Sequence, residues 1–71
     1  MNLIIDIGNT FAKLAVFSPE GMMEMARCSN QSLDALVTLC ERFPIKRCLV
    51  STVVTLNERI LKQLEDLPFP V

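Results

Sequence analysis

Residues 2–17 read NLIIDIGNTFAKLAVF, which is two apolar runs separated by a short polar turn. The first run, Leu3-Ile4-Ile5, ends at Asp6 and is typical of a central strand covered on both faces. After the break at Gly8-Asn9, apolar residues return with a period of two, which predicts a second strand over residues 11–17. One face of this strand would carry Ala12, Leu14 and Val16, and the other Phe11, Lys13, Ala15 and Phe17.

The chain continues with a turn, a third strand and a helix. Ser18-Pro19-Glu20-Gly21 has proline at the second turn position and glycine at the fourth, so residues 22–28 are predicted to return as a strand. A helical period follows, with Asn30 or Ser32 as its N-cap and Phe43-Pro44 as its end. The apolar stripe of this helix would consist of Leu33, Leu36, Val37 and Cys40.

A fourth strand and a second helix complete the pattern. Residues 47–54 contain the β-rich run CLVSTVV, and Thr55-Leu56-Asn57-Glu58 has the spacing of a capping box with Thr55 as the N-cap. The helix would present Ile60, Leu61, Leu64 and Leu67 and end before Pro68. The order β-β-β-α-β-α predicts an α/β fold with a mixed sheet, in which the first strand lies between the second and the fourth. One face and one edge of that sheet would be unfinished.

Length and composition restrict the function classes. The 71 residues suffice for one small domain, 51% of them are hydrophobic, and the net charge is −1 without a run of either sign. We therefore expect no nucleic-acid partner and no membrane partner. No apolar stretch is long enough to cross a bilayer, and the N-terminus lacks the pattern of a signal peptide, so we expect a cytoplasmic protein.

Three cysteines, Cys28, Cys40 and Cys48, accompany a complete lack of histidine. Without a C-x-x-C pair or a histidine, we expect no zinc site and no Ser-His or Cys-His nucleophile. The cysteines are interpreted as reduced thiols of a cytosolic protein. Any chemistry would then fall to carboxylates and a bound metal ion.

The turn Asp6-Ile7-Gly8-Asn9-Thr10 can be interpreted as a phosphate site. Gly8 has no Cβ to obstruct a phosphate, successive amides of such a turn can bind an anion, and Thr10 adds a hydroxyl donor. Asp6 is placed to hold Mg²⁺, directly or through water. Lys13 could reach the phosphates. Spacing by itself favours a plain hairpin turn, and the alternation of the second strand is equally compatible with Lys13 facing solvent.

The stretch NLIIDIGNTFAKLAVF resembles the opening of type III pantothenate kinases, also called the Bvg accessory factor family. This family lies in the acetate and sugar kinase/Hsp70/actin superfamily. The likeness extends to residues 50–54, VSTVV, which is similar to the family's S-S-V-V-P segment, although Thr52 stands where serine is usual and Thr55 where proline is common. The resemblance implies an RNase H-like, actin-like ATPase half-domain, with residues 1–71 as its N-terminal part and the rest of that domain and a second domain absent.

The resemblance also implies a function. The parent protein would be a transferase that phosphorylates pantothenate to 4'-phosphopantothenate with ATP, the first step of coenzyme A biosynthesis. Residues 6–10 and Lys13 would bind the ATP phosphates, with Asp6 as the metal-organising residue for Mg²⁺ and a monovalent cation as a further requirement. The family's G-x-D-R general base has no counterpart before Val71, so no catalytic residue is expected here and the fragment would be inactive.

Other interpretations stay open at this stage. A kinase of the same superfamily with another substrate usually has D-x-G-T-T at this turn, and Asn9 departs from it. A regulatory, nucleotide-binding accessory factor would keep the turn without turnover. A metal nuclease of RNase H type would need several carboxylates, and Asp6 is the one candidate. The resemblance further implies a homodimer, and the unfinished sheet predicts self-association of the fragment.

Overall fold

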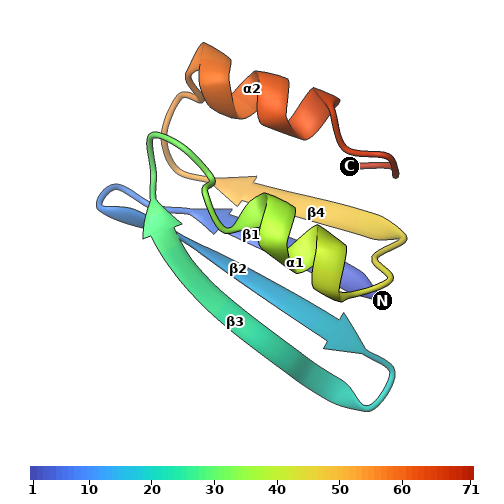
Figure 1. The fold of residues 1–71 in the computed structure, drawn as a ribbon. Coiled ribbons are helices and arrows are strands. Elements are labelled where there is room, and N and C mark those ends of the chain that lie inside the picture. Colours follow the sequence, from blue (N-terminus) through green and yellow to red (C-terminus); the bar gives the residue numbers. More distant parts are fainter.

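A four-stranded mixed sheet carries both helices on one face in the computed structural model, which describes all 71 residues (Figure 1). The strand order is β3-β2-β1-β4. The elements are β1 (Asn2–Ile7), β2 (Phe11–Ser18), β3 (Gly21–Ser29), α1 (Leu36–Arg42), β4 (Arg47–Thr52) and α2 (Glu58–Glu65). The predicted α/β class, the order β-β-β-α-β-α and the mixed sheet are therefore confirmed. Neither helix has the length and apolar character needed to cross a membrane.

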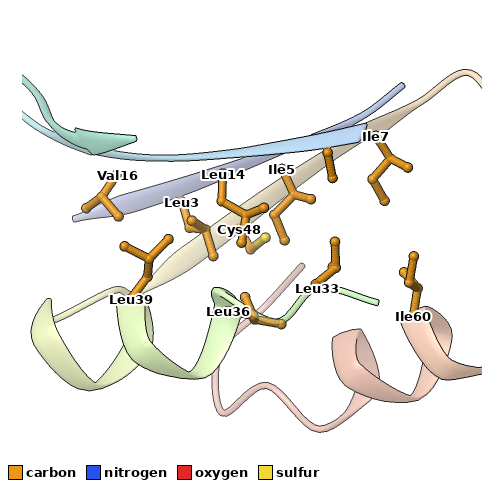
Figure 2. Close-up of a cluster of buried hydrophobic side chains, with 11 residues drawn as sticks. Leu3, Ile5, Ile7, Leu14, Val16, Leu33, Leu36, Leu39, Cys48 and Ile60 are labelled. Atoms are coloured by element: carbon orange, nitrogen blue, oxygen red, sulfur yellow. The ribbon is translucent and has the colours of Figure 1, made fainter. Parts of the chain in front are cut away.

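Strand β1 occupies the centre of the sheet, as predicted. It pairs antiparallel with β2 and parallel with β4. Leu3, Ile5 and Ile7 are fully buried beneath the helices, whereas Asp6 is exposed and Ile4 is half-buried on the opposite face. The expectation of cover on both faces is therefore wrong for this chain, because both helices lie on the same side (Figure 2). We call the uncovered side the open face.

The core lies between the sheet and the two helices (Figure 2). Its buried members come from β1, β2, β4 and the helical layer, and the helical layer contributes Leu33, Leu36, Leu39 and Ile60. The predicted face of β2 is confirmed, since Ala12, Leu14 and Val16 are all fully buried. Burying these aliphatic side chains supplies the main favourable free energy of the fold.

The first helix differs from its predicted stripe. It begins at Leu36 without a side-chain cap, so neither Asn30 nor Ser32 is its N-cap. The preceding residues form a turn in which the Leu36 amide donates to the Leu33 carbonyl oxygen at 3.1 Å. This turn shifts the phase of the helix, which leaves Val37 63% exposed and buries Leu39 instead. The end before Phe43-Pro44 is as predicted, because Phe43 is already extended.

The second helix begins two residues later than the capping box predicted. Asn57 is its N-cap, and Asn57 Oδ1 accepts a hydrogen bond from the Ile60 amide at 2.8 Å, whereas Thr55 lies exposed outside the helix. Strand β4 also ends earlier than predicted, because the Thr52 hydroxyl bonds the Val54 backbone in a turn. Leu61 was predicted to be part of the apolar face and is 47% exposed.

The corrected cap gives a direct test. Asn57→Ala should lower the free energy of unfolding by about 1 kcal/mol, because an unsatisfied amide remains at the start of α2. Thr55→Ala should change it by less than about 0.5 kcal/mol. Urea unfolding of both variants would decide between the two caps. A larger loss for Thr55→Ala than for Asn57→Ala would restore the capping box.

The outer edge of β4 was predicted to lack a neighbour. The structure corrects this at one point, since the Cys48 amide donates to the Pro70 carbonyl oxygen at 2.9 Å. Leu49 on the same strand points to the open face and is 66% exposed. The C-terminal residues therefore cover only the beginning of this edge.

Candidate functional site

The loop between β1 and β2 is a tight hairpin closed by one backbone hydrogen bond. The Gly8 amide donates to the Phe11 carbonyl oxygen at 3.0 Å. A Cβ at Gly8 would lie 3.2 Å from that same oxygen, which is closer than side chains ordinarily approach backbone. Gly8 does not have a positive φ. Glycine is therefore favoured here by the close approach of the two hairpin arms and not by a left-handed conformation.

A row of polar side chains crosses the open face beside this loop. Asp6 of β1 lies directly opposite Lys13 of β2, and Lys13 lies opposite Arg27 of β3. On the other side Asp6 neighbours Ser51 of β4. All four residues are exposed. The sheet register therefore brings one carboxylate and two cationic side chains to the same face, close to the end of β1.

A shallow pocket of about 210 Å³ opens at this point of the sheet. It is lined by Asp6, Gly8, Asn9, Thr10, Phe11 and Lys13. Five of the six residues predicted to bind phosphate thus share one pocket with Phe11. The sixth, Ile7, has its side chain buried in the core and its carbonyl oxygen bonded to the Val53 amide at 3.1 Å. Ile7 therefore anchors the start of the loop on the core, and its side chain does not line the pocket.

The pocket has donors and charges suited to a phosphate. The Asn9 and Thr10 amides take no part in the backbone hydrogen bonds of the turn, and Thr10 is exposed with a free hydroxyl donor. Lys13 offers three N–H donors and a positive charge. Its ammonium lies 5.8 Å from the centre of the Phe11 ring. These groups could neutralise and orient an anion that carries several oxygens.

The sequence interpretation missed three residues near the pocket. Phe11 lines it directly, and the Arg27 guanidinium stacks over the Phe11 ring at 4.1 Å from its centre. Asn30, considered only as a helix cap, donates from Nδ2 to the carbonyl oxygens of Gly8 and Asn9. The position of Phe11 directly after the motif is the one signal in the sequence that could have drawn attention to it.

Asp6 is the one carboxylate in the pocket. Glu24, the only other carboxylate within the strands, lies on the helix-covered side of β3 and pairs with Arg42 of α1 at 3.1 Å. No group of three or more histidine, cysteine, aspartate or glutamate side chains in the chain could hold a metal ion. A single carboxylate fits Mg²⁺ that is held jointly by the protein and substrate phosphates, and it does not fit an all-protein metal cage.

The three cysteines are free thiols and lie away from the pocket. Burial, and secondly the neighbouring Cys40, raise the pKa of the Cys48 thiol to about 11. Cys48 is therefore a neutral thiol at physiological pH and a poor nucleophile.

This pKa gives a prediction on pH. Because the Cys48 pKa is above its ordinary value of 9.0 in the folded protein, stability is unaffected below pH 9 and falls as the pH rises from 9 towards 11. Iodoacetamide at pH 8 should modify Cys28 well before Cys48, as peptide mass spectrometry would measure. Substituting Cys48→Ser should reduce the loss of stability between pH 9 and 11 and leave the part due to Cys40, whose pKa burial also raises. Equal labelling of both thiols would contradict the burial of Cys48.

Fold and pocket together define a class. A mixed β-β-β-α-β-α sheet with a polar hairpin after its central strand is consistent with part of an actin-like ATPase domain. Two strains of Bacteroides fragilis have type III pantothenate kinases that are 52% identical to the chain over all 71 residues. The type III pantothenate kinase of Phocaeicola vulgatus is 54% identical over the same 71 residues. The predicted resemblance to type III pantothenate kinases is thereby confirmed along the whole chain.

The match covers only part of the length of each relative. The chain spans 29% of the length of each of these three proteins. No family model matches the chain. No solved structure matches it either.

Proposed function

We propose that the protein containing this chain transfers the γ-phosphate of ATP to pantothenate, giving 4'-phosphopantothenate at the start of coenzyme A biosynthesis in the cytoplasm. The observation that carries the proposal is the pocket in which Asp6, the backbone of residues 8–10 and Lys13 meet. The names of the three relatives support the acceptor, and the pocket supports the binding of phosphate.

Each pocket residue has a role in the proposal. The Asn9 and Thr10 amides and the Thr10 hydroxyl would donate to phosphate oxygens, and Lys13 would add charge because it shares the open face with Asp6. Asp6 would hold Mg²⁺, which supplies charge neutralisation to the phosphates when bound. Phosphoryl transfer depends mainly on such positioning and electrostatic stabilisation. A monovalent cation requirement rests on the family resemblance alone.

Residues 1–71 would then be the N-terminal part of an actin-like ATPase domain, and the general base and second domain would belong to the remaining sequence. The relatives are more than three times as long as this chain, which supports that division. The chain by itself would have no kinase activity. A homodimer of the parent protein, and self-association of the isolated chain, are consistent with apolar side chains on the open face such as Met25 and Leu49.

The experiment is an assay of the full-length protein with ATP, Mg²⁺ and pantothenate, followed by mass spectrometry of the product. Formation of 4'-phosphopantothenate is the expected result. Binding of ATP without phosphorylation of pantothenate or of any sugar or acetate acceptor would support a nucleotide-binding accessory factor instead. Phosphorylation of another acceptor would place the protein among kinases with a different substrate. Absence of ATP binding would overturn the proposal.

A further inference from the structure

Asn30 lies directly after β3 and contacts the β1–β2 loop across 21 residues of sequence. Its Nδ2 donates to the Asn9 carbonyl oxygen at 2.9 Å and to the Gly8 carbonyl oxygen at 3.1 Å. Both partners are carbonyl oxygens, which only accept hydrogen bonds, so the amide nitrogen of Asn30 must face the loop. One side-chain NH₂ group thus bonds two successive peptide units.

These two hydrogen bonds determine where the loop amides point. All peptide bonds of the chain are trans, and in a trans peptide the N–H lies opposite the C=O of the same unit. The carbonyl of Gly8 shares its peptide unit with the amide of Asn9, and the carbonyl of Asn9 shares its unit with the amide of Thr10. Because both carbonyls are turned towards Asn30, both amides are turned away from it. Asn9 and Thr10 line the pocket and Asn30 does not.

The loop needs such a support. Two-residue hairpins favour turns with a positive φ at one or both central residues, because that twist matches the flanking strands. No residue of this loop has a positive φ. The Gly8 carbonyl is bound by Asn30, and the hairpin is closed by the single bond from the Gly8 amide to Phe11. Asn30 therefore gives the Gly8 carbonyl the hydrogen bond that the Phe11 amide would supply in a regular hairpin.

Asn30 is itself held in place by the second helix. Asn57 Nδ2 donates to the carbonyl oxygen of Gln31 at 2.9 Å, while Asn57 Oδ1 caps α2. Two residues further on, the Leu33 amide donates to Gln63 Oε1 at 3.0 Å. The segment that carries Asn30 is thus anchored on α2 at two points. The orientation of the loop is coupled through Asn30 to the start of a packed helix.

We propose that Asn30 is a positioning residue for nucleotide phosphates. By binding the carbonyls of two successive peptide units, it presents the Asn9 and Thr10 amides to the pocket before any phosphate arrives. Pre-organised donors stabilise an anion without the cost of reorienting at the moment of binding. The inference rests on the proposed function of the β1–β2 loop and assigns to it a residue that does not itself line the pocket.

The test compares full-length protein carrying Asn30→Asp with full-length protein carrying Asn2→Asp. The first change keeps the shape of the side chain but faces two carbonyl oxygens with a carboxylate, which cannot donate. The second makes the same chemical change at an exposed asparagine with no side-chain hydrogen bond, at the far end of β1. Asn30→Asp should raise the Kd and the KM for ATP about tenfold or more, as expected from losing hydrogen bonds to a charged ligand. The KM for pantothenate should stay within twofold, and Asn2→Asp should change neither constant.

A second variant covers the case in which Asn30→Asp fails to fold. Asn57→Asp keeps a cap oxygen for α2 but removes the donor to Gln31, so it should raise the KM for ATP in the same direction by a smaller factor. An unchanged KM for ATP in every variant that folds would overturn the role of Asn30, and so would equal increases in the KM for ATP and the KM for pantothenate. Those outcomes leave the proposed kinase function standing if the unmutated protein binds ATP. Failure of the unmutated protein to bind ATP would overturn both proposals.

Discussion

Replacing Asp6 by asparagine should lower kcat for ATP-dependent phosphorylation by the full-length protein by about 100-fold or more, the usual effect of removing one group that stabilises transition-state charge. Asp6 is the sole carboxylate of the pocket and is exposed at the end of the central strand. Asparagine keeps the size of the side chain but loses the charge that would hold Mg²⁺ beside the phosphates. The apparent affinity for Mg²⁺ should fall together with kcat.

Glu20→Gln provides the matched control for this prediction. Glu20 is an exposed carboxylate in the β2–β3 turn, at the opposite end of β2 from the pocket. The Glu20→Gln variant loses the same charge as Asp6→Asn and should change kcat by less than twofold. Steady-state kinetics at several Mg²⁺ concentrations, with thermal melting as a check on folding, would measure both effects. Full activity of Asp6→Asn at low Mg²⁺ would refute the metal role of this carboxylate.

The strands could be predicted from the sequence because each is encoded locally. The period of two over residues 11–17 and the turn at residues 18–21 identify the β1–β2–β3 meander, and Gly21 has the positive φ that favours glycine at such a turn. The helices were predicted less accurately. Helix α1 has only seven residues, so a turn that begins at Leu33 was enough to move Leu39 into the core in place of Val37.

The prediction of the N-cap of α2 failed for a related reason. Thr55 and Asn57 are both good N-cap residues, and the spacing to Glu58 favoured Thr55. The choice between them depends on tertiary structure, because Asn57 bonds both the helix and the distant Gln31 carbonyl. A pattern read along the chain contains no information on that second partner.

Some residues of the candidate site could likewise be placed from the sequence and others could not. Asp6 and Lys13 could be placed together from the sequence, since a short turn between two strands fixes their register. Arg27 could not. Pairing continued without interruption from Ser18 and Gly21 would have set Ala26 opposite Lys13, and an irregularity beside Phe17 instead brings Arg27 to that position. One inserted residue moves a strand's side chains to the other face.

The central strand also gives the largest predicted effect on stability. Ile5 and Ile4 are the same residue type at adjacent positions of β1, yet Ile5 is fully buried and Ile4 is half-buried on the open face. Ile5→Ala should lower the free energy of unfolding by about 2–5 kcal/mol, because it removes buried methyl groups and leaves a cavity beneath the helices. Ile4→Ala should cost clearly less in the 71-residue chain, because much of its side chain already contacts solvent.

A small domain has little stability to lose, often about 5 kcal/mol in total. We therefore expect the 71-residue chain with Ile5→Ala to be largely unfolded at 25 °C, while the chain with Ile4→Ala keeps its far-ultraviolet circular dichroism and a cooperative urea transition. Equal losses in the two variants would mean that the open face is as well covered as the helical face, for instance by self-association. Repeating the measurement at several protein concentrations separates that case, because stability gained from association increases with concentration.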